Sequence, residues 1–140
     1  MTSYMTLYEK CLSRIEDPTL TQLPEEDLEN MLHEWLMSAV AKMRKCVSDL
    51  SNRDEELKQF NIDLLDVEQE VLAILMVRAW VSQQLYSVTN TLQVFSGKET
   101  KYYSQAAHLA ELRELDTKLK IEAQQLSRDY TYADNDYFSD

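Results

Sequence analysis

The sequence predicts an all-α protein, a helical bundle of about four helices with a long loop before the last helix and an extended C-terminal tail. Its 140 residues contain one glycine, Gly97, and two prolines, Pro18 and Pro24. Glycine supplies the left-handed turns and bulges that many-stranded β folds need, so few such turns are expected. Over the long stretches without these residues, apolar side chains recur at three- and four-residue steps, the spacing of amphipathic helices.

Two helices are expected before residue 48. The first, over residues 3–15, carries one apolar stripe and ends before Pro18, because the residue preceding a proline is pushed out of the helical region. The second begins at Pro24, which fits the first helical position, where its missing N–H is not needed. Three acidic residues follow Pro24 and complement the positive end of the helix dipole. The helical spacing then continues to Met43.

Residues 48–64 do not show helical spacing. Residues 48–54 are polar except for Leu50 and are expected to form a loop. From Phe60 to Leu64, apolar and polar residues alternate with the period of a strand. A single strand has no obvious partner in this chain, so we expect the segment either to pair with another subunit or, as we favour, to be irregular.

A third helix is expected from Asp66 to Thr89, with Gln69 in the position of a capping box. Between Val71 and Val81 its apolar residues surround nearly the whole circumference, as in a helix that is buried on all sides. This pattern predicts either the centre of a bundle or burial completed by a neighbouring subunit. Arg78 lies within this run, and we expect it to extend to the surface or to pair with a nearby Glu.

The main loop is expected over residues 89–103, although one flanking helix could extend into it. The fourth helix then begins with Ser104 as its cap. Four leucines of this helix match a and d sites of a heptad pattern that Glu122 breaks: Leu112, Leu115, Leu119 and Leu126. The span is too short for a coiled coil, so we expect the helix to pack in the bundle through one stripe.

The sequence divides into a helical bundle domain, residues 1–128, and an acidic, aromatic C-terminal tail, residues 129–140. The tail contains four Asp, three Tyr and one Phe, and no basic residue. Its acidity is typical of a solvated end, whereas aromatic side chains dominate binding hot spots. Two interpretations therefore stay open, a solvated end and a peptide that docks into another subunit.

The formal net charge of −11 argues against sequence-specific binding to duplex DNA, which normally requires a basic face. Cys11 and Cys46 lie 35 residues apart without a zinc-binding spacing, and we expect both to be reduced and unreactive. The start of the chain does not resemble a signal peptide. The most apolar run, Val71 to Val77, is far shorter than the roughly 20 residues that cross a bilayer. We therefore expect a protein made in a cytoplasm and not bound to membranes.

The sequence contains no arrangement of residues that is typical of an active site. His33 and His108 each lie on an expected helix, and neither follows a Glu by three residues as in di-metal carboxylate bundles, because Asn30 and Gln105 occupy those positions. Phosphate-binding loops, nucleophile elbows and dinucleotide fingerprints are absent from the sequence. We expect no enzymatic activity, no cofactor and no metal.

Two segments resemble a family of small α-helical head–tail connector (adaptor or neck) proteins of tailed bacteriophages and prophages of Gram-positive bacteria. Residues 34–42 read EWLMSAVAK, and the more specific segment, residues 95–113, includes FSGKE and YYSQAAHLAELR. The resemblance covers the order of elements over most of the chain. It implies a structural virion protein that forms a ring, commonly a dodecamer, beneath the portal, with a flexible loop and tail contacting neighbours.

The partners expected on this basis are further copies of the chain, the portal protein, and tail or neck proteins, with at most non-specific proximity to DNA in a channel. The candidate partner-binding residues lie in the expected loop and tail: Phe95, Gly97, Lys98, Tyr102, Tyr130, Tyr132, Tyr137 and Phe138. Two other functions remain open, a phage tail-completion protein or assembly chaperone, and a non-viral helical regulator that binds a protein partner.

Overall fold

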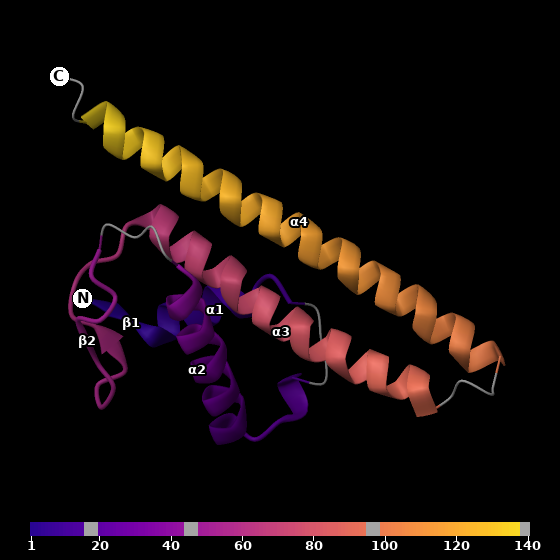
Figure 1. The fold of residues 1–140 in the computed structure, drawn as a ribbon. Coiled ribbons are helices and arrows are strands. Elements are labelled where there is room, and N and C mark those ends of the chain that lie inside the picture. Colours follow the sequence, from indigo (N-terminus) through magenta and orange to yellow (C-terminus); the bar gives the residue numbers. More distant parts are fainter. Residues whose placement is uncertain (16–19, 44–47, 95–98, 138–140) are drawn as a thin grey trace.

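The computed structural model describes residues 1–15, 20–43, 48–94 and 99–137, and it confirms the predicted all-α fold. Four helices carry the structure: α1 (Tyr4–Leu12), α2 (Glu25–Lys42), α3 (Asp66–Val94) and α4 (Glu99–Tyr137). A short 3₁₀ helix, η1 (Leu20–Gln22), precedes α2, and a small sheet contains β1 (Thr2–Ser3), β2 (Arg53–Asp54) and β3 (Gln59–Phe60). Figure 1 shows α3 and α4 as two long neighbouring helices, with α1, α2 and the sheet gathered on the side of α3 away from α4.

The middle of α3 forms the centre of the core. All residues from Val71 to Val77 are buried, and α3 has extensive interfaces with α1, α2 and α4. The all-round apolar pattern therefore reflects the centre of a bundle, the first of the two alternatives. Its burial is completed within the chain and does not require a neighbouring subunit. Beyond Val81 the exposure changes, since Ser82, Gln83 and Tyr86 face solvent.

The predicted starts of α1 and α2 agree closely with the structure. Ser3 is the N-cap of α1, and its hydroxyl oxygen accepts a hydrogen bond from the Met5 amide at 3.2 Å. The helix ends at Leu12 and is slightly shorter than expected. Pro24 directly precedes α2, whose first turn carries three acidic residues.

Only Gln59–Phe60 of this segment forms a strand, and it pairs within the chain and not with another subunit, whereas residues 61–65 have no regular secondary structure, as we favoured. Strand β3 lies between β1 and β2 and is antiparallel to both, with Phe60 opposite Thr2 on one side and Arg53 on the other. Phe60 is fully buried, and its ring lies 5.2 Å from that of Tyr4. The sheet therefore attaches the start of the chain to the helical core.

The β2–β3 hairpin forms without a glycine. Lys58 adopts a positive φ of 53°, a left-handed conformation that costs a residue with a Cβ atom about 1 kcal/mol. The Asp54 carboxylate accepts hydrogen bonds from the amides of Glu56 and Leu57, at 2.9 and 3.0 Å, and so satisfies the turn. Lys58 also forms an ion pair with Glu29 of α2. These contacts stabilise a left-handed turn of the kind that we expected to be rare in a chain with one glycine.

Glu68 is a fully buried carboxylate in the first turn of α3. Its Oε1 accepts hydrogen bonds from the Leu65 amide at 2.8 Å and the Ser48 hydroxyl at 2.7 Å, and its Oε2 accepts one from the Ser48 amide at 3.1 Å. The bond to Leu65 is the glutamate half of a capping box, one position before the predicted Gln69. Glu68 thus joins the start of α3 to the segment that follows α2.

Glu70 connects the end of α1 to α3 and α4. Its two carboxylate oxygens accept hydrogen bonds from Lys10 and Arg14, both at 3.0 Å, and Arg14 also donates to Glu122 of α4 at 3.3 Å. The hydrogen bonds from Lys10 and Arg14 hold the pKa of Glu70 below its ordinary value. Three elements therefore meet at one partly exposed group of charges.

Acid is expected to weaken the protein partly through Glu70. Its lowered pKa means that the unfolded chain binds more protons at this group, so the stability it contributes is present above the ordinary carboxyl pKa and is lost as the pH falls from that value through the lowered pKa of the folded state. In urea titrations between about pH 5 and about pH 3, Glu70→Gln should lose less stability than the wild type. Glu34→Gln, at an exposed position, is the control. Parallel curves for wild type and Glu70→Gln would contradict this assignment.

Helices α3 and α4 are longer than expected and occupy most of the predicted loop and tail. Helix α3 ends at Val94 and α4 begins at Glu99, so the flanking helices do extend into residues 89–103. The expectation of an extended tail is wrong up to Tyr137, because residues 129–137 continue α4 without a break. The segment contains neither proline nor glycine, and nothing in its sequence interrupts a helix that is already formed.

Cys11 lies in the core, where it is fully buried. Burial raises the pKa of its thiol to about 12, which keeps the sulfur protonated and unreactive at neutral pH. Cys46 lies outside the described residues. The described helices include none that is long and apolar enough to cross a membrane.

Candidate functional site

Helices α3 and α4 form a hairpin and share the largest interface between elements of the described structure. Half of the candidate partner-binding residues lie on α4 of this hairpin. Helix α4 contributes a row of residues at alternating three- and four-residue steps, buried or half-buried against the core: Leu109, Leu112, Asp116, Leu119, Ala123 and Leu126. Helix α3 contributes a similar row: Val71, Ile74, Arg78, Val81 and Leu85. This spacing is that of an antiparallel coiled coil, and we call the α4 row the seam.

One ion pair joins the two rows. Arg78 of α3 donates from Nε to the Asp116 carboxylate of α4 at 3.0 Å, and the two side chains are 24% and 30% exposed. The expected ion pair of Arg78 is therefore present, with an Asp as its partner in place of the expected Glu. The pair also sets the register of the two antiparallel helices. Seven residues from the pair in one direction, Leu85 of α3 is level with Leu109 of α4. Seven residues in the other direction, Val71 is level with Ala123.

The predicted heptad phase was partly wrong. Leu112 and Leu119 are buried, but Leu115 is 37% exposed and lies outside the seam. Glu122 does not break the pattern, since it lies on the outer surface and pairs with Arg14. The true seam passes through Asp116 and Ala123, a charged and a small residue that a search for large apolar side chains passes over.

Two leucines of α4 therefore differ in their expected contribution to stability. Leu119→Ala should lower the free energy of unfolding by about 2 kcal/mol, because it leaves a cavity in the seam. Leu115→Ala should lower it by less than about 1 kcal/mol, because the side chain is already partly in water. Urea unfolding followed by circular dichroism measures both. Equal effects would contradict the seam as assigned.

Four of the eight candidate partner-binding residues lie within α4. These are Tyr102 in its first turns, and Tyr130, Tyr132 and Tyr137 near its end. The other four, Phe95, Gly97, Lys98 and Phe138, lie outside the described residues. Among the described candidates, Tyr102 thus lies near one end of the 39-residue helix α4, and Tyr130, Tyr132 and Tyr137 lie near the other.

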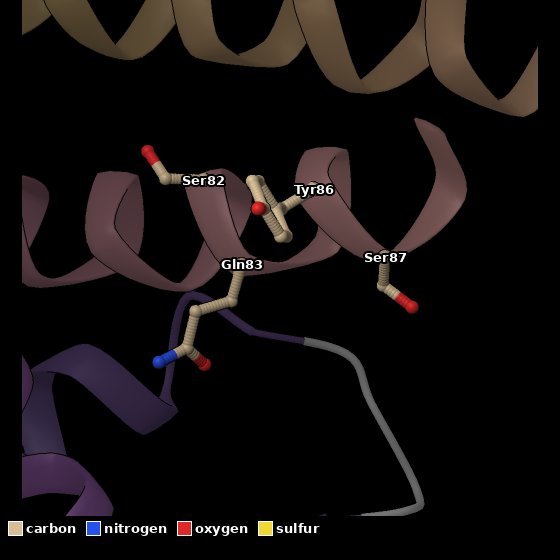
Figure 2. A pocket seen from close by; sticks show the side chains of 4 residues that line it. All are labelled: Ser82, Gln83, Tyr86 and Ser87. Atoms are coloured by element: carbon tan, nitrogen blue, oxygen red, sulfur yellow. The ribbon is translucent and has the colours of Figure 1, made fainter. Parts of the chain in front are cut away.

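An open depression of about 520 Å³ lies on the exposed part of α3, lined by Ser82, Gln83, Tyr86 and Ser87. Figure 2 shows these four side chains spaced along α3, with Gln83 pointing away from α4. Tyr86 is 74% exposed and is a large aromatic side chain on an otherwise polar surface.

A cluster of titratable groups surrounds Glu55, beside the sheet. The Glu55 carboxylate accepts hydrogen bonds from the Tyr4 hydroxyl at 3.0 Å and from Arg53 at 3.1 Å, and it lies 2.7 Å from Nε2 of His33. Burial would raise the pKa of Glu55, but the hydrogen bonds from His33, Tyr4 and Arg53 outweigh it and lower the pKa. Burial, and then the bond to Glu55, raise the pKa of Tyr4, so its hydroxyl stays a donor.

The Glu55 cluster connects α1, α2 and β2, and its polar atoms are used in bonds to one another. Sequence reasoning missed it because its four residues come from three separate segments. Among the residues that the structure describes, no three His, Cys, Asp or Glu side chains are grouped as metal ligands. His108 is exposed on α4. No family model, no curated protein and no solved structure matches this chain.

Proposed function

We propose that this chain is a structural subunit of a phage head–tail connector, which forms a ring between the portal and the tail. The observation that carries the proposal is the α3–α4 hairpin together with the segment that gave the resemblance. Residues 99–113 of that segment form the first turns of α4, at the end of the hairpin far from the sheet (Figure 1). The other segment, residues 34–42, lies on α2 in the bundle.

The hairpin supports this proposal through its shape. Beyond Val81, the side chains of Ser82, Gln83 and Tyr86 of α3 are exposed. A two-helix arm of this kind presents surface on both of its helices, which a ring subunit needs because heterologous contacts use two different patches of each copy. The acidic charge would oppose adhesion of DNA passing through a channel.

Counting copies in purified particles tests the proposal. A connector should occur in mature virions at a fixed ratio to the portal protein, a dodecamer if the resemblance holds, and should appear as a ring in electron micrographs of the neck. A protein found only in assembly intermediates would be a chaperone, and a protein bound to host factors would be a regulator. Either result would contradict the connector function.

Removal of residues 129–140 should separate folding from assembly. We expect a chain ending at Arg128 to remain helical, because the described core lies before this residue, but to enter particles poorly. A chain ending at Tyr137 is the control that keeps all of α4. Circular dichroism and the amount of protein per particle are the two measurements. If the shorter chain joined particles as well as the full one, the tail would have no docking role.

A further inference from the structure

Helix α4 is longer than the helix that covers it. Asp66, the first residue of α3, is level with Arg128, because each lies twelve residues from the Arg78–Asp116 pair. Residues 129–137 of α4 therefore have no α3 residue beside them, and α3 is the one element with which α4 shares an extensive interface in the described structure. In Figure 1 this overhang, drawn in yellow, continues past the start of α3. It is about 13 Å long.

The pattern of the seam continues into the overhang. The steps of three and four residues that place Leu119, Ala123 and Leu126 against α3 lead next to Tyr130, Ala133 and Tyr137. These positions are aromatic or apolar, like the buried part of the seam. The third tyrosine, Tyr132, does not fit this pattern of three- and four-residue steps. In the sequence, the pattern of the seam therefore continues along α4 beyond the start of α3.

The overhang is also acidic, with Asp129, Asp134 and Asp136 and no basic residue. The negative end of the α4 dipole lies at the same end of the helix. A helix that covers the overhang must therefore offer positive charge beside an apolar strip. In a chain with a net charge of −11, few surfaces meet this requirement.

One flank of α4 itself offers positive charge beside an apolar side chain. Arg113, Lys120 and Arg128 lie along this flank and form no ion pair with the residues that the structure describes, whereas Lys10, Arg14, Arg53, Lys58, Arg78 and Lys118 are all paired. Ile121, which is 54% exposed, lies beside them. The flank is about 22 Å long, enough to accommodate the overhang.

We infer that the overhang of one copy packs along the Arg113–Arg128 flank of α4 in a second copy of this chain. A copy cannot make this contact with itself, because its own overhang extends away from its own flank along the same helix. The contact joins two different patches, so a pair of copies retains one free overhang and one free flank, and association continues to a closed ring or to an open filament. The inference concerns the chain alone and stands whether or not the connector function is correct.

Sedimentation of the purified full-length protein tests the inference. From about 1 to about 100 μM, the range in which small interfaces dissociate, we expect association that increases with concentration and weakens in high salt. Tyr130→Ala/Tyr137→Ala should weaken it about tenfold or more, whereas the matched control Tyr132→Ala should not. Circular dichroism verifies that each variant is folded. A wild type that is monomeric throughout this range would overturn the inference.

A second pair of variants tests the flank. Arg113→Glu/Lys120→Glu should abolish association, whereas Lys42→Glu/Lys118→Glu, with the same change in net charge at exposed sites elsewhere, should leave it intact. Mixing Arg113→Glu/Lys120→Glu with Tyr130→Ala/Tyr137→Ala should give 1:1 heterodimers and nothing larger, since each pair then has one intact overhang and one intact flank. Heterodimers that fail to form would overturn the inference.

Nucleic acid is the competing occupant of a basic flank. A labelled DNA duplex that binds the wild type but not Arg113→Glu/Lys120→Glu, with self-association unaffected by the same substitutions, would assign the flank to DNA and overturn the inference. Absence of this DNA binding, together with the heterodimers, would support it.

Discussion

Replacement of Trp35 with alanine is expected to lower the free energy of unfolding by about 4 kcal/mol, the largest effect of any single substitution considered for this protein. Trp35 is 2% exposed and lies on the face of α2 that packs toward α3. Truncation removes the largest buried side chain and leaves a cavity beside the central helix. Urea unfolding monitored by circular dichroism at 222 nm measures the loss.

Trp35→Phe separates volume from hydrogen bonding at the same site. The indole Nε1 of Trp35 is buried with no acceptor among the described residues, so its loss removes no hydrogen bond. We expect Trp35→Phe to cost about 1 kcal/mol, for reduced volume alone. A cost close to that of Trp35→Ala would show that the indole N–H contributes to stability and would contradict this assignment.

Replacement of Glu68 with alanine is expected to lower the free energy of unfolding by about 3 kcal/mol. The carboxylate is fully buried and accepts hydrogen bonds from both polar groups of Ser48 and from the Leu65 amide. Alanine would leave these donors without their acceptor and would remove the cap of α3. Glu68→Gln keeps one carbonyl oxygen as an acceptor and should lose less.

Ser48→Ala is the matched control for Glu68→Ala. It removes the hydroxyl donor alone and keeps the backbone amide bond, so we expect a loss of about 1 kcal/mol. Thermal unfolding of Glu68→Ala, Glu68→Gln and Ser48→Ala gives the order of their losses of stability. If Glu68→Ala were no worse than Ser48→Ala, the remaining bonds of Glu68 would be unimportant for stability.

The helices were predictable because their signals are local. Pro24 and its acidic neighbours set the start of α2, and the all-round apolar run from Val71 to Val77 identified the core helix. The sheet was not predictable, because the partner of Phe60 is Thr2, 58 residues away, and no pattern within a short window reports such a pairing. Composition also misled at two points, since Lys58 replaced glycine in a tight turn and the acidic tail proved helical to Tyr137.

The candidate surfaces were predictable to a smaller extent. Their aromatic residues were chosen by residue type and stay a prediction, whereas the face of α4 that packs against α3 comes from the structure. That face is set by Asp116 and Ala123 as much as by Leu119, and Asp116 becomes recognisable only once Arg78 is known to lie opposite. The structure also removes one earlier argument for an oligomer, because the apolar run of α3 from Val71 to Val77 is buried within its own chain. The connector function therefore depends on the hairpin and the resemblance.

The Arg78–Asp116 pair makes incorrect alignments of the hairpin costly. Sliding one helix by a heptad, about 10 Å, would bring Arg78 opposite Leu109 or Ala123 and leave two charges facing apolar neighbours. Leucine-rich rows alone would tolerate such a slip. The ion pair therefore specifies a single register of the two helices. As a result, the tip of the hairpin lies at the same distance from the core in every copy of the protein.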